Sequence, residues 1–224
     1  MARKVMIATP AHDGAVCVQY AHSIYHTGRL CAEHGIDIVP IWLPGESLIQ
    51  RARNELLRIA VDGDVDDLIF IDADQGWDPR HVLTLLGRPV DAVGAPIRKK
   101  TDESESYNVR ASSPHIPVDP RTGLMVVEGV GTGFLRLSRK AVAALWNGAV
   151  PYRDGGRDHR MVFEVKIIEG ALWSEDTVMC AKLRHAGIPV HLDPSIVVEH
   201  VGGKTYSGDF RSYLGRLNGA HAAS

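Results

Sequence analysis

The first half of the chain alternates between short apolar runs and longer segments in which apolar residues recur with helical spacing. The strand-like runs are residues 5–8, 36–41, 67–71 and 91–95. The helical segments are residues 15–33, 47–60 and 79–86. Gly35 is a typical helix stop, and Ser47 is a favourable N-cap for the second helix. This strand–helix–strand order predicts right-handed crossovers and a parallel sheet.

The second half of the chain is less regular. Residues 99–122 are polar and contain three prolines, which predicts a long loop that serves as a lid or binding loop. Residues 151–160 predict another polar loop, and residues from 202 onward predict a mobile tail rich in glycine and aromatic side chains. The remaining segments predict strands at residues 124–127, 133–137, 188–192 and 196–199, which complete the sheet, and helices at residues 139–146 and 174–186.

The composition is that of an ordinary globular protein. Of 224 residues, 45% are hydrophobic and 23% are charged, and the net charge is −2, which gives no case for a non-specific nucleic-acid or anionic-membrane binder. The three cysteines form no Cys-x-x-Cys pair, which favours a reduced, cytoplasmic protein. The apolar start of the chain is too short for a signal peptide, and no apolar run approaches the roughly 20 residues of a membrane span.

An Asp-x-Asp pair follows the third predicted strand, in Phe70-Ile-Asp72-Ala-Asp74. Open α/β sheets bind ligands outside the carboxyl ends of their strands, and two carboxylates at such an edge suit a hard divalent cation. A pair in an Asp-rich region is also typical of a solvated surface. The buried strand that precedes this pair favours the metal-binding interpretation.

Two further acids, Glu175 and Asp176, open the helix predicted from Ser174. Acids in the first turn interact favourably with the helix dipole, and this alone would account for both. In the functional alternative, one carboxylate projects into a cleft and acts as a general base.

His200 and Lys204 follow the last predicted strand, in Glu199-His200-Val-Gly-Gly-Lys204. The imidazole could complete a metal site, and the lysine could hold a phosphate. On the second helix, Arg51 and Asn54 are three residues apart and share a face, so they could bind a diphosphate together. The alternative for that pair is a solvated helix face.

Two common nucleotide-binding motifs are absent from the sequence. The glycine-rich stretch from Gly129 fails the dinucleotide fingerprint because its sixth position is Phe134, and no Gly-x-x-x-x-Gly-Lys-Ser/Thr occurs. The sequence therefore supports neither a dinucleotide site nor a P-loop.

Six motifs, taken in chain order, resemble those of GT-A-type glycosyltransferases, of the family 2-like kind found in small bacterial and viral enzymes. They are Ser47-Leu-Ile-x-Arg51-Ala-Arg53-Asn54, Phe70-Ile-Asp72-Ala-Asp74, Gly94-Ala-Pro-Ile-x-x-Lys100, Gly131-Thr-Gly-Phe134, Trp173-Ser-Glu-Asp176 and His200-Val-Gly. The resemblance spans about residues 8–208. It implies one GT-A-like (Rossmann-like) α/β domain over residues 1–224, with a mostly parallel central sheet flanked by helices. Residues 1–98 would bind the nucleotide sugar, and 99–201 the acceptor.

The resemblance also implies a nucleotide-diphosphate sugar donor, most commonly a UDP-sugar, and a divalent metal, Mn²⁺ or Mg²⁺. Asp72 would face the donor ribose or the metal, Asp74 would bind the metal, and His200 would be a further ligand. Asp176 matches the family's acid–base position, with Glu175 beside it.

The same resemblance places Thr9, Pro10 and His12 where the first strand meets the nucleotide base. The loop Ala11-His-Asp13-Gly departs from the acidic loop of the commonest family members, which leaves the nucleotide open. Arg51, Asn54 and Lys204 would complete the donor site.

The chemistry of sugar transfer is consistent with these residues. A divalent cation would neutralise the departing diphosphate, and an inverting enzyme needs a base such as Asp176 to deprotonate the acceptor hydroxyl. A retaining enzyme would not need that base.

Three other functions stay open. A sugar nucleotidyltransferase normally has a glycine-rich loop after the first strand, where this chain has only Gly14, and a phosphohydrolase needs a lysine-led second motif. A non-catalytic nucleotide- or sugar-binding module would have no use for Asp176. The acceptor is open among a glycan, a small molecule and a hydroxylated base in viral DNA, and the loop at 99–121 is expected to frame it.

Overall fold

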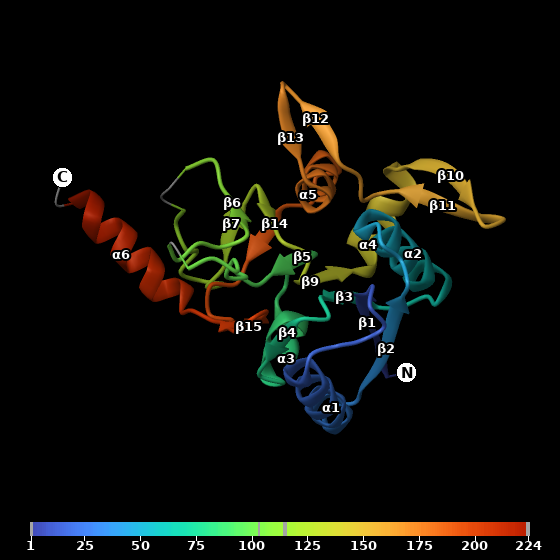
Figure 1. The fold of residues 1–224 in the computed structure, drawn as a ribbon, viewed down its shortest axis with the longest axis horizontal. Coiled ribbons are helices and arrows are strands. Elements are labelled where there is room, and N and C mark those ends of the chain that lie inside the picture. The colour runs from blue at the N-terminus through green and yellow to red at the C-terminus, as the bar shows by residue number, and fades with distance from the viewer. Residues whose placement is uncertain (1, 103, 114–115, 223–224) are drawn as a thin grey trace.

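A seven-stranded sheet runs through the centre of the molecule (Figure 1). The computed structural model describes residues 2–102, 104–113 and 116–222. In sheet order, the strands are β2 (Ile36–Pro44), β1 (Arg3–Ala11), β3 (Asp67–Ile71), β9 (Phe134–Ser138), β5 (Ala92–Gly94), β14 (Val190–Leu192) and β7 (Met125–Val127). Only β9 and β7 run against their neighbours in this sheet, so the predicted mostly parallel sheet is confirmed.

Helices cover both faces of this sheet. They are α1 (Val18–Glu33), α2 (Ile49–Asp62), α3 (Arg80–Gly87), α4 (Arg139–Gly148) and α5 (Glu175–His185), whereas a further helix, α6 (Phe210–Ala222), lies apart from the sheet (Figure 1). Met6 and Ala8 of β1 lie in the core with α2, α4 and α5. Val5 and Ile7 lie in the core with α1 and α3, because alternate residues of a strand point to opposite faces. The two cores hold the sheet between two helical layers.

Of two helix-boundary signals in the sequence, the stop after α1 agrees with the structure and the N-cap of α2 does not. Gly35 has φ +68° just after α1, as expected of a helix stop. The N-cap of α2 is Leu48 rather than Ser47, and it makes no side-chain cap bond. The carboxylate of Glu46 accepts the Leu48 N–H at 3.0 Å, so an acid just before the helix takes part of the role assigned to serine.

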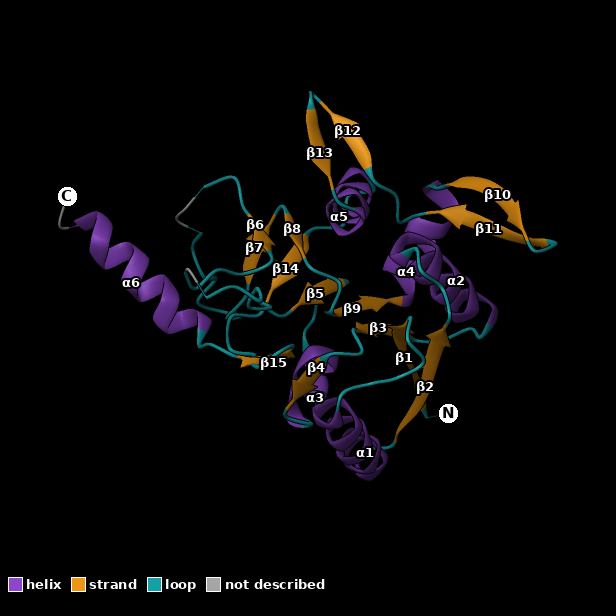
Figure 2. Cartoon of the chain, viewed as in Figure 1, coloured by secondary structure: helices purple, strands orange, loops and turns teal. Residues whose placement is uncertain are grey.

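Residues predicted as a polar loop at 151–160 instead form a hairpin of β10 (Val150–Asp154) and β11 (Arg157–Met161). Its turn places Gly155 and Gly156 at positive φ. A second hairpin, β12 (Lys166–Ile168) and β13 (Ala171–Trp173), was not predicted. Figure 2 shows both hairpins projecting from the body, near α2 and α5. The strands of the first hairpin carry many polar residues, which weakens their strand signal, and those of the second are only three residues long.

The strand predicted at residues 196–199 was expected to belong to the central sheet. It lies instead in a separate, three-stranded sheet. β15 (Val198–Val201) pairs with β4 (Gln75–Trp77) and β16 (Thr205–Tyr206). In this register His200 lies opposite Gln75. The small sheet thereby brings the segment after the last predicted strand beside the Asp-x-Asp pair.

The loop predicted at 99–122 is irregular except for β6 (Val109–Arg110), which pairs with β8 (Gly129–Val130); residues 103, 114 and 115 lie outside the description. The tail contains α6, which was not predicted and extends away from the sheet (Figure 1). The Phe210 ring packs on Tyr107 at 4.7 Å between centroids. Residues 223 and 224 are outside the description. No helix in the described ranges has the length and apolar character needed to cross a membrane.

Candidate functional site

Asp72 lies at the carboxyl end of β3, beside the glycine-rich segment that leads into β9. Its N–H donates to the Gly133 carbonyl at 3.1 Å. A Cβ on Gly133 would lie 2.7 Å from an Asp72 carboxylate oxygen, so residue 133 must be glycine to leave room for this side chain. The Gly131-Thr-Gly-Phe134 motif therefore makes space for the acid at this strand end.

Arg53 of α2 holds Asp72 and Glu175 together. Its Nη2 donates to Asp72 Oδ1 at 2.9 Å, and its Nη1 donates to Glu175 Oε1. Arg53 is only 5% exposed. No role was predicted for Arg53 beyond its place in a motif. The available signal was an arginine on a helix face that it shares with the apolar residues Leu57 and Ala60.

Asp74 and His200, two of the three residues predicted to bind a metal, lie close together. His200 Nε2 lies 3.4 Å from Asp74 Oδ2, and Lys100 Nζ lies 2.5 Å from the same oxygen. Burial raises the pKa of Asp74, but hydrogen bonds and charge from His200 and Lys100 outweigh burial and lower the pKa to about 2. Asp74 is therefore ionised across the physiological range.

The surroundings of Asp74 and His200 fit a cation in two respects. The Arg98 carbonyl lies 2.8 Å from His200 Nδ1, which leaves Nε2 as the nitrogen that faces Asp74. Asp74 Oδ1 is buried and has no hydrogen-bond partner. Asp72 is directed to Arg53 instead, and among the described residues no three His, Cys, Asp or Glu side chains are placed to hold one metal. Of the three residues predicted to bind a metal, the structure therefore places Asp74 and His200 side by side and Asp72 apart from them.

Asp176 lines a pocket of about 350 Å³ between the first turn of α5, β8 and the loop before β6. Its Oδ1 accepts from the Ser174 hydroxyl and from the Thr177 N–H, the latter at 2.7 Å. No hydrogen bond to Oδ2 and no ion pair of Asp176 occurs within the described part of the chain. Its neighbour Glu175 forms an ion pair with Arg53 through Oε1, so of the two acids Asp176 is the one without a cationic partner among the described residues.

The expected base-binding residues lie near the end of β1, at the same sheet edge as Asp72. Thr9 is fully buried, and its hydroxyl lies 2.6 Å from the Tyr20 hydroxyl. Pro10 is also buried, whereas His12 is exposed. Of these three residues, His12 has the accessible side chain.

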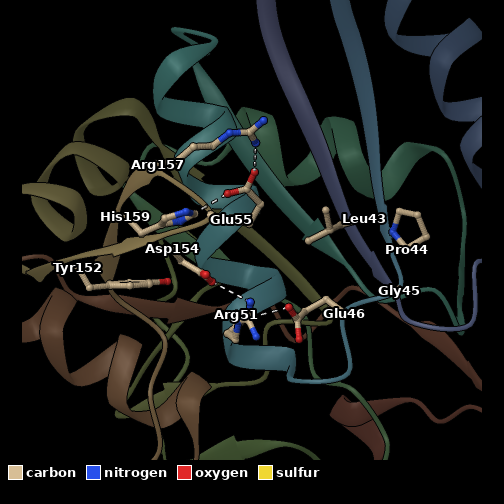
Figure 3. Close-up of a pocket in the computed structure, with 11 residues that line it drawn as sticks. Leu43, Pro44, Gly45, Glu46, Arg51, Glu55, Tyr152, Asp154, Arg157 and His159 are labelled. Atoms are coloured by element: carbon tan, nitrogen blue, oxygen red, sulfur yellow. Dashed lines mark hydrogen bonds and ion pairs between the residues drawn. The ribbon is translucent and has the colours of Figure 1, made fainter.

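Arg51 and Asn54 do not share one environment. Asn54 is 1% exposed, and its amide bonds to backbone atoms of residues 162 and 163, which anchors the segment after β11. Arg51 instead lines a second pocket, of about 410 Å³, between α2, the end of β2 and the β10–β11 hairpin (Figure 3). There Arg51 pairs with Asp154 at 2.8 Å. The structure does not bring Asn54 to a surface where it could meet a diphosphate.

Lys204 follows β15, close to His200 in the chain, and remains at the surface. Its ammonium pairs with Asp102 and lies 5.1 Å from the centre of the Tyr206 ring. The side chain is 58% exposed.

Several buried polar atoms near the Asp-x-Asp pair lack partners. They are Asp74 Oδ1, both side-chain polar atoms of Gln75, Thr132 Oγ1 and Arg53 Nε. Most buried polar atoms in proteins are hydrogen-bonded, so unsatisfied atoms beside an acid pair call for an explanation such as a ligand, water or ion. They mark this end of β3 as the candidate site.

The comparisons with known proteins show the fold. No protein-family model and no curated protein sequence matches the chain. The crystal structure of A197 from STIV aligns over 89% of this chain and 86% of its own, with TM-score 0.56 and 16% identity. A glycosyltransferase involved in the glycosylation of the major capsid of PBCV-1 aligns over 62% of each chain, with TM-score 0.36 and 12% identity. The first match shows a shared fold, and the second is too weak to carry an argument.

Proposed function

We propose that the protein is a GT-A-type glycosyltransferase that transfers a sugar from a nucleotide-diphosphate donor to an acceptor hydroxyl. The observation that supports this best is the meeting of two pairs of acids at one sheet edge. Asp72 and Asp74 come from the end of β3, Glu175 and Asp176 come from the start of α5, and Arg53 joins the two pairs. The proposed metal-assisted binding of the donor uses the acids at the end of β3, and the proposed removal of the acceptor proton uses those at the start of α5.

Asp74 and His200 are the proposed protein ligands of Mn²⁺ or Mg²⁺. Such a cation is commonly held by one or two protein side chains and by the phosphates of the substrate. When bound, it supplies positive charge to the departing diphosphate. Lys100, already beside Asp74, and Lys204 are the nearby lysines proposed to hold phosphate oxygens.

Asp176 is the proposed base. A base needs a free oxygen that faces the substrate, and Asp176 has no hydrogen bond to Oδ2 among the described residues and lines the 350 Å³ pocket. Its position in the first turn of α5 favours the ionised carboxylate. Removal of the acceptor proton by Asp176 corresponds to an inverting reaction.

The acceptor is proposed to enter the pocket beside Asp176. The loop that starts at Lys99 lines this pocket with Tyr107, Asn108 and Arg110, as expected of a loop that frames the acceptor. The lining is mostly polar, which suits a hydroxyl-bearing compound.

The proposal is tested by incubating the protein with a panel of nucleotide sugars, UDP-sugars first, and measuring release of the nucleoside diphosphate. We expect release to need Mn²⁺ or Mg²⁺, to stop in excess EDTA and to be lost in Asp74→Asn. Lys140→Gln, far from the site in α4, is the control and should retain release. Full release in EDTA would overturn the metal assignment. If no donor gave either release or nucleotide binding, the transferase proposal would be overturned.

A further inference from the structure

Arg53 is a buried cation that joins two distant parts of the chain. Its carboxylate partners, Asp72 and Glu175, are separated from it by 19 and 122 residues. One partner ends β3 and the other begins α5. The remaining guanidinium nitrogen, Nε, is buried and has no hydrogen-bond partner, so the two carboxylates fix the position of this group.

The geometry requires arginine rather than lysine. A guanidinium presents several N–H donors in a rigid plane and can bind two carboxylates at once, whereas an ammonium acts as a single point charge. The Glu175 and Asp72 side chains are 15% and 31% exposed. Without Arg53, both partly buried carboxylates would lose their cation, which is far costlier than loss of a surface pair.

We propose that Arg53 is a positioning residue that couples the donor-binding acids to the general base. By holding Glu175, it fixes the first turn of α5, in which Asp176 is the next residue. By holding Asp72, it links that turn to the strand end that carries Asp74. This inference rests on the proposed function and adds that the two acid pairs work only in the arrangement set by Arg53.

A purely structural ion pair is the competing interpretation, and the chain contains a matched example. Arg136 of β9 is also 5% exposed and binds Asp67, at the opposite end of β3, at 2.6 Å. Asp67 binds Arg3 as well, at 2.6 Å, so one carboxylate there serves two arginines. Arg136→Lys is therefore the control for Arg53→Lys, because both changes keep the charge and remove the planar donor set.

The kinetic test compares Arg53→Lys, Glu175→Gln, their double variant and Arg136→Lys. We expect Arg53→Lys to lower kcat by roughly 10²-fold, as expected when a catalytic group is displaced by about 1 Å, with a much smaller change in donor KM. The double variant should be no slower than the slower single variant, because both changes break one contact. Arg136→Lys should lower the melting temperature and leave kcat within about threefold. Unchanged kcat in folded Arg53→Lys, or multiplied effects in the double variant, would overturn the proposal.

Hydrogen exchange tests the same proposal without activity. Val178 N–H bonds to the Ser174 carbonyl at 2.9 Å, and the next amides of α5 bond back to the same first turn. We expect faster exchange at residues 178–180 in Arg53→Lys and wild-type exchange there in Arg136→Lys. Equal exchange in wild type and Arg53→Lys would overturn the positioning role. If the wild type transfers no sugar, the proposed function fails, whereas this measurement still decides whether Arg53 fixes the turn.

Discussion

The two ends of β3 carry aspartates in opposite situations. At the amino end, Asp67 is 1% exposed, and each carboxylate oxygen binds an arginine at 2.6 Å, one from Arg3 and the other from Arg136. At the carboxyl end, Asp72 shares its arginine, Arg53, with Glu175. One oxygen of Asp74 at this end is buried without a hydrogen-bond partner. Both ends are charged, but only one leaves acceptor atoms unsatisfied.

We interpret this difference as that between an acid that serves the fold and an acid that is proposed to serve the site. A buried carboxylate whose oxygens are both paired with arginines is already satisfied by the fold, whereas one with an unpartnered oxygen can still gain a cation or a donor. The carboxyl ends of parallel strands are also the edge at which open α/β sheets bind ligands. We therefore interpret Asp67 as part of the fold and Asp74 as part of the site.

The largest expected effect is that of Asp176→Asn. The amide cannot take a proton from the acceptor, so transfer should fall by roughly 10²–10⁴-fold, the usual contribution of a general base. Donor and metal binding should change little, because Asp74 and His200 are untouched. Steady-state kinetics and nucleotide titration on the same preparation measure both effects. Wild-type turnover would favour a retaining mechanism or another base, whereas lost donor binding would make Asp176 structural.

Asp67→Asn should act on stability instead. The change leaves Arg3 and Arg136 without their shared carboxylate, which should lower the free energy of unfolding by about 3–5 kcal/mol. Denaturant unfolding measures this loss, and kcat per folded molecule should stay at the wild-type value. A stable Asp67→Asn with reduced kcat would remove the distinction between the two ends of β3.

His200→Ala should weaken the dependence on metal. The loss of one of two proposed protein ligands should raise the Mn²⁺ concentration for half-maximal activity by at least about tenfold, in the range seen for altered metal surroundings. Lys204→Ala is the comparison and should lower donor affinity without this change. An unaltered Mn²⁺ requirement in His200→Ala would leave His200 as a surface residue.

The smallest effect is expected away from β3, at Glu55 in the pocket of Figure 3. Hydrogen bonds from Arg58 lower the pKa of Glu55 in the fold, against the opposing effect of burial. A depressed pKa stabilises the fold above the unfolded value of about 4.3, and this stabilisation is lost as the pH falls below it. Glu55→Gln should therefore flatten the stability profile at pH values below about 4.3. Denaturant unfolding curves at several pH values measure this change. An unchanged pH dependence of the free energy of unfolding would show that the pair of Glu55 and Arg58 adds nothing to stability.

The sequence predicted the parts of the fold that depend on local pattern. The buried strand at 67–71 agrees with β3, and the N-cap at Ser174 agrees with α5, because apolar runs and helix caps act over a few residues. The hairpin at 150–161 and helix α6 were missed. Their polar sequences gain stability from contacts such as that of Phe210 with Tyr107, which no local pattern contains.

The candidate site likewise divides into features that a local sequence pattern predicts and features that depend on contacts between distant residues. The position of Asp72 and Asp74 at a strand end was predictable, because a buried apolar run precedes them. The pairing of Arg53 with Glu175 joins residues 122 positions apart, and the place of β15 beside β4 depends on a small sheet. Asn54 matched a motif and an exposed helix face equally well, and only the fold shows that it anchors backbone.

The proposed donor site at the carboxyl end of β3 is tested most directly by calorimetric titration of nucleoside diphosphates, UDP first, with Mn²⁺ or with EDTA. The proteins are wild type, Asp74→Asn and Asp67→Asn, the last measured at a temperature at which it is folded. We expect Mn²⁺-dependent binding in wild type and Asp67→Asn and none in Asp74→Asn. Binding that survives in Asp74→Asn, or that is equal in Mn²⁺ and EDTA, would contradict a metal-assisted donor site at this end of β3.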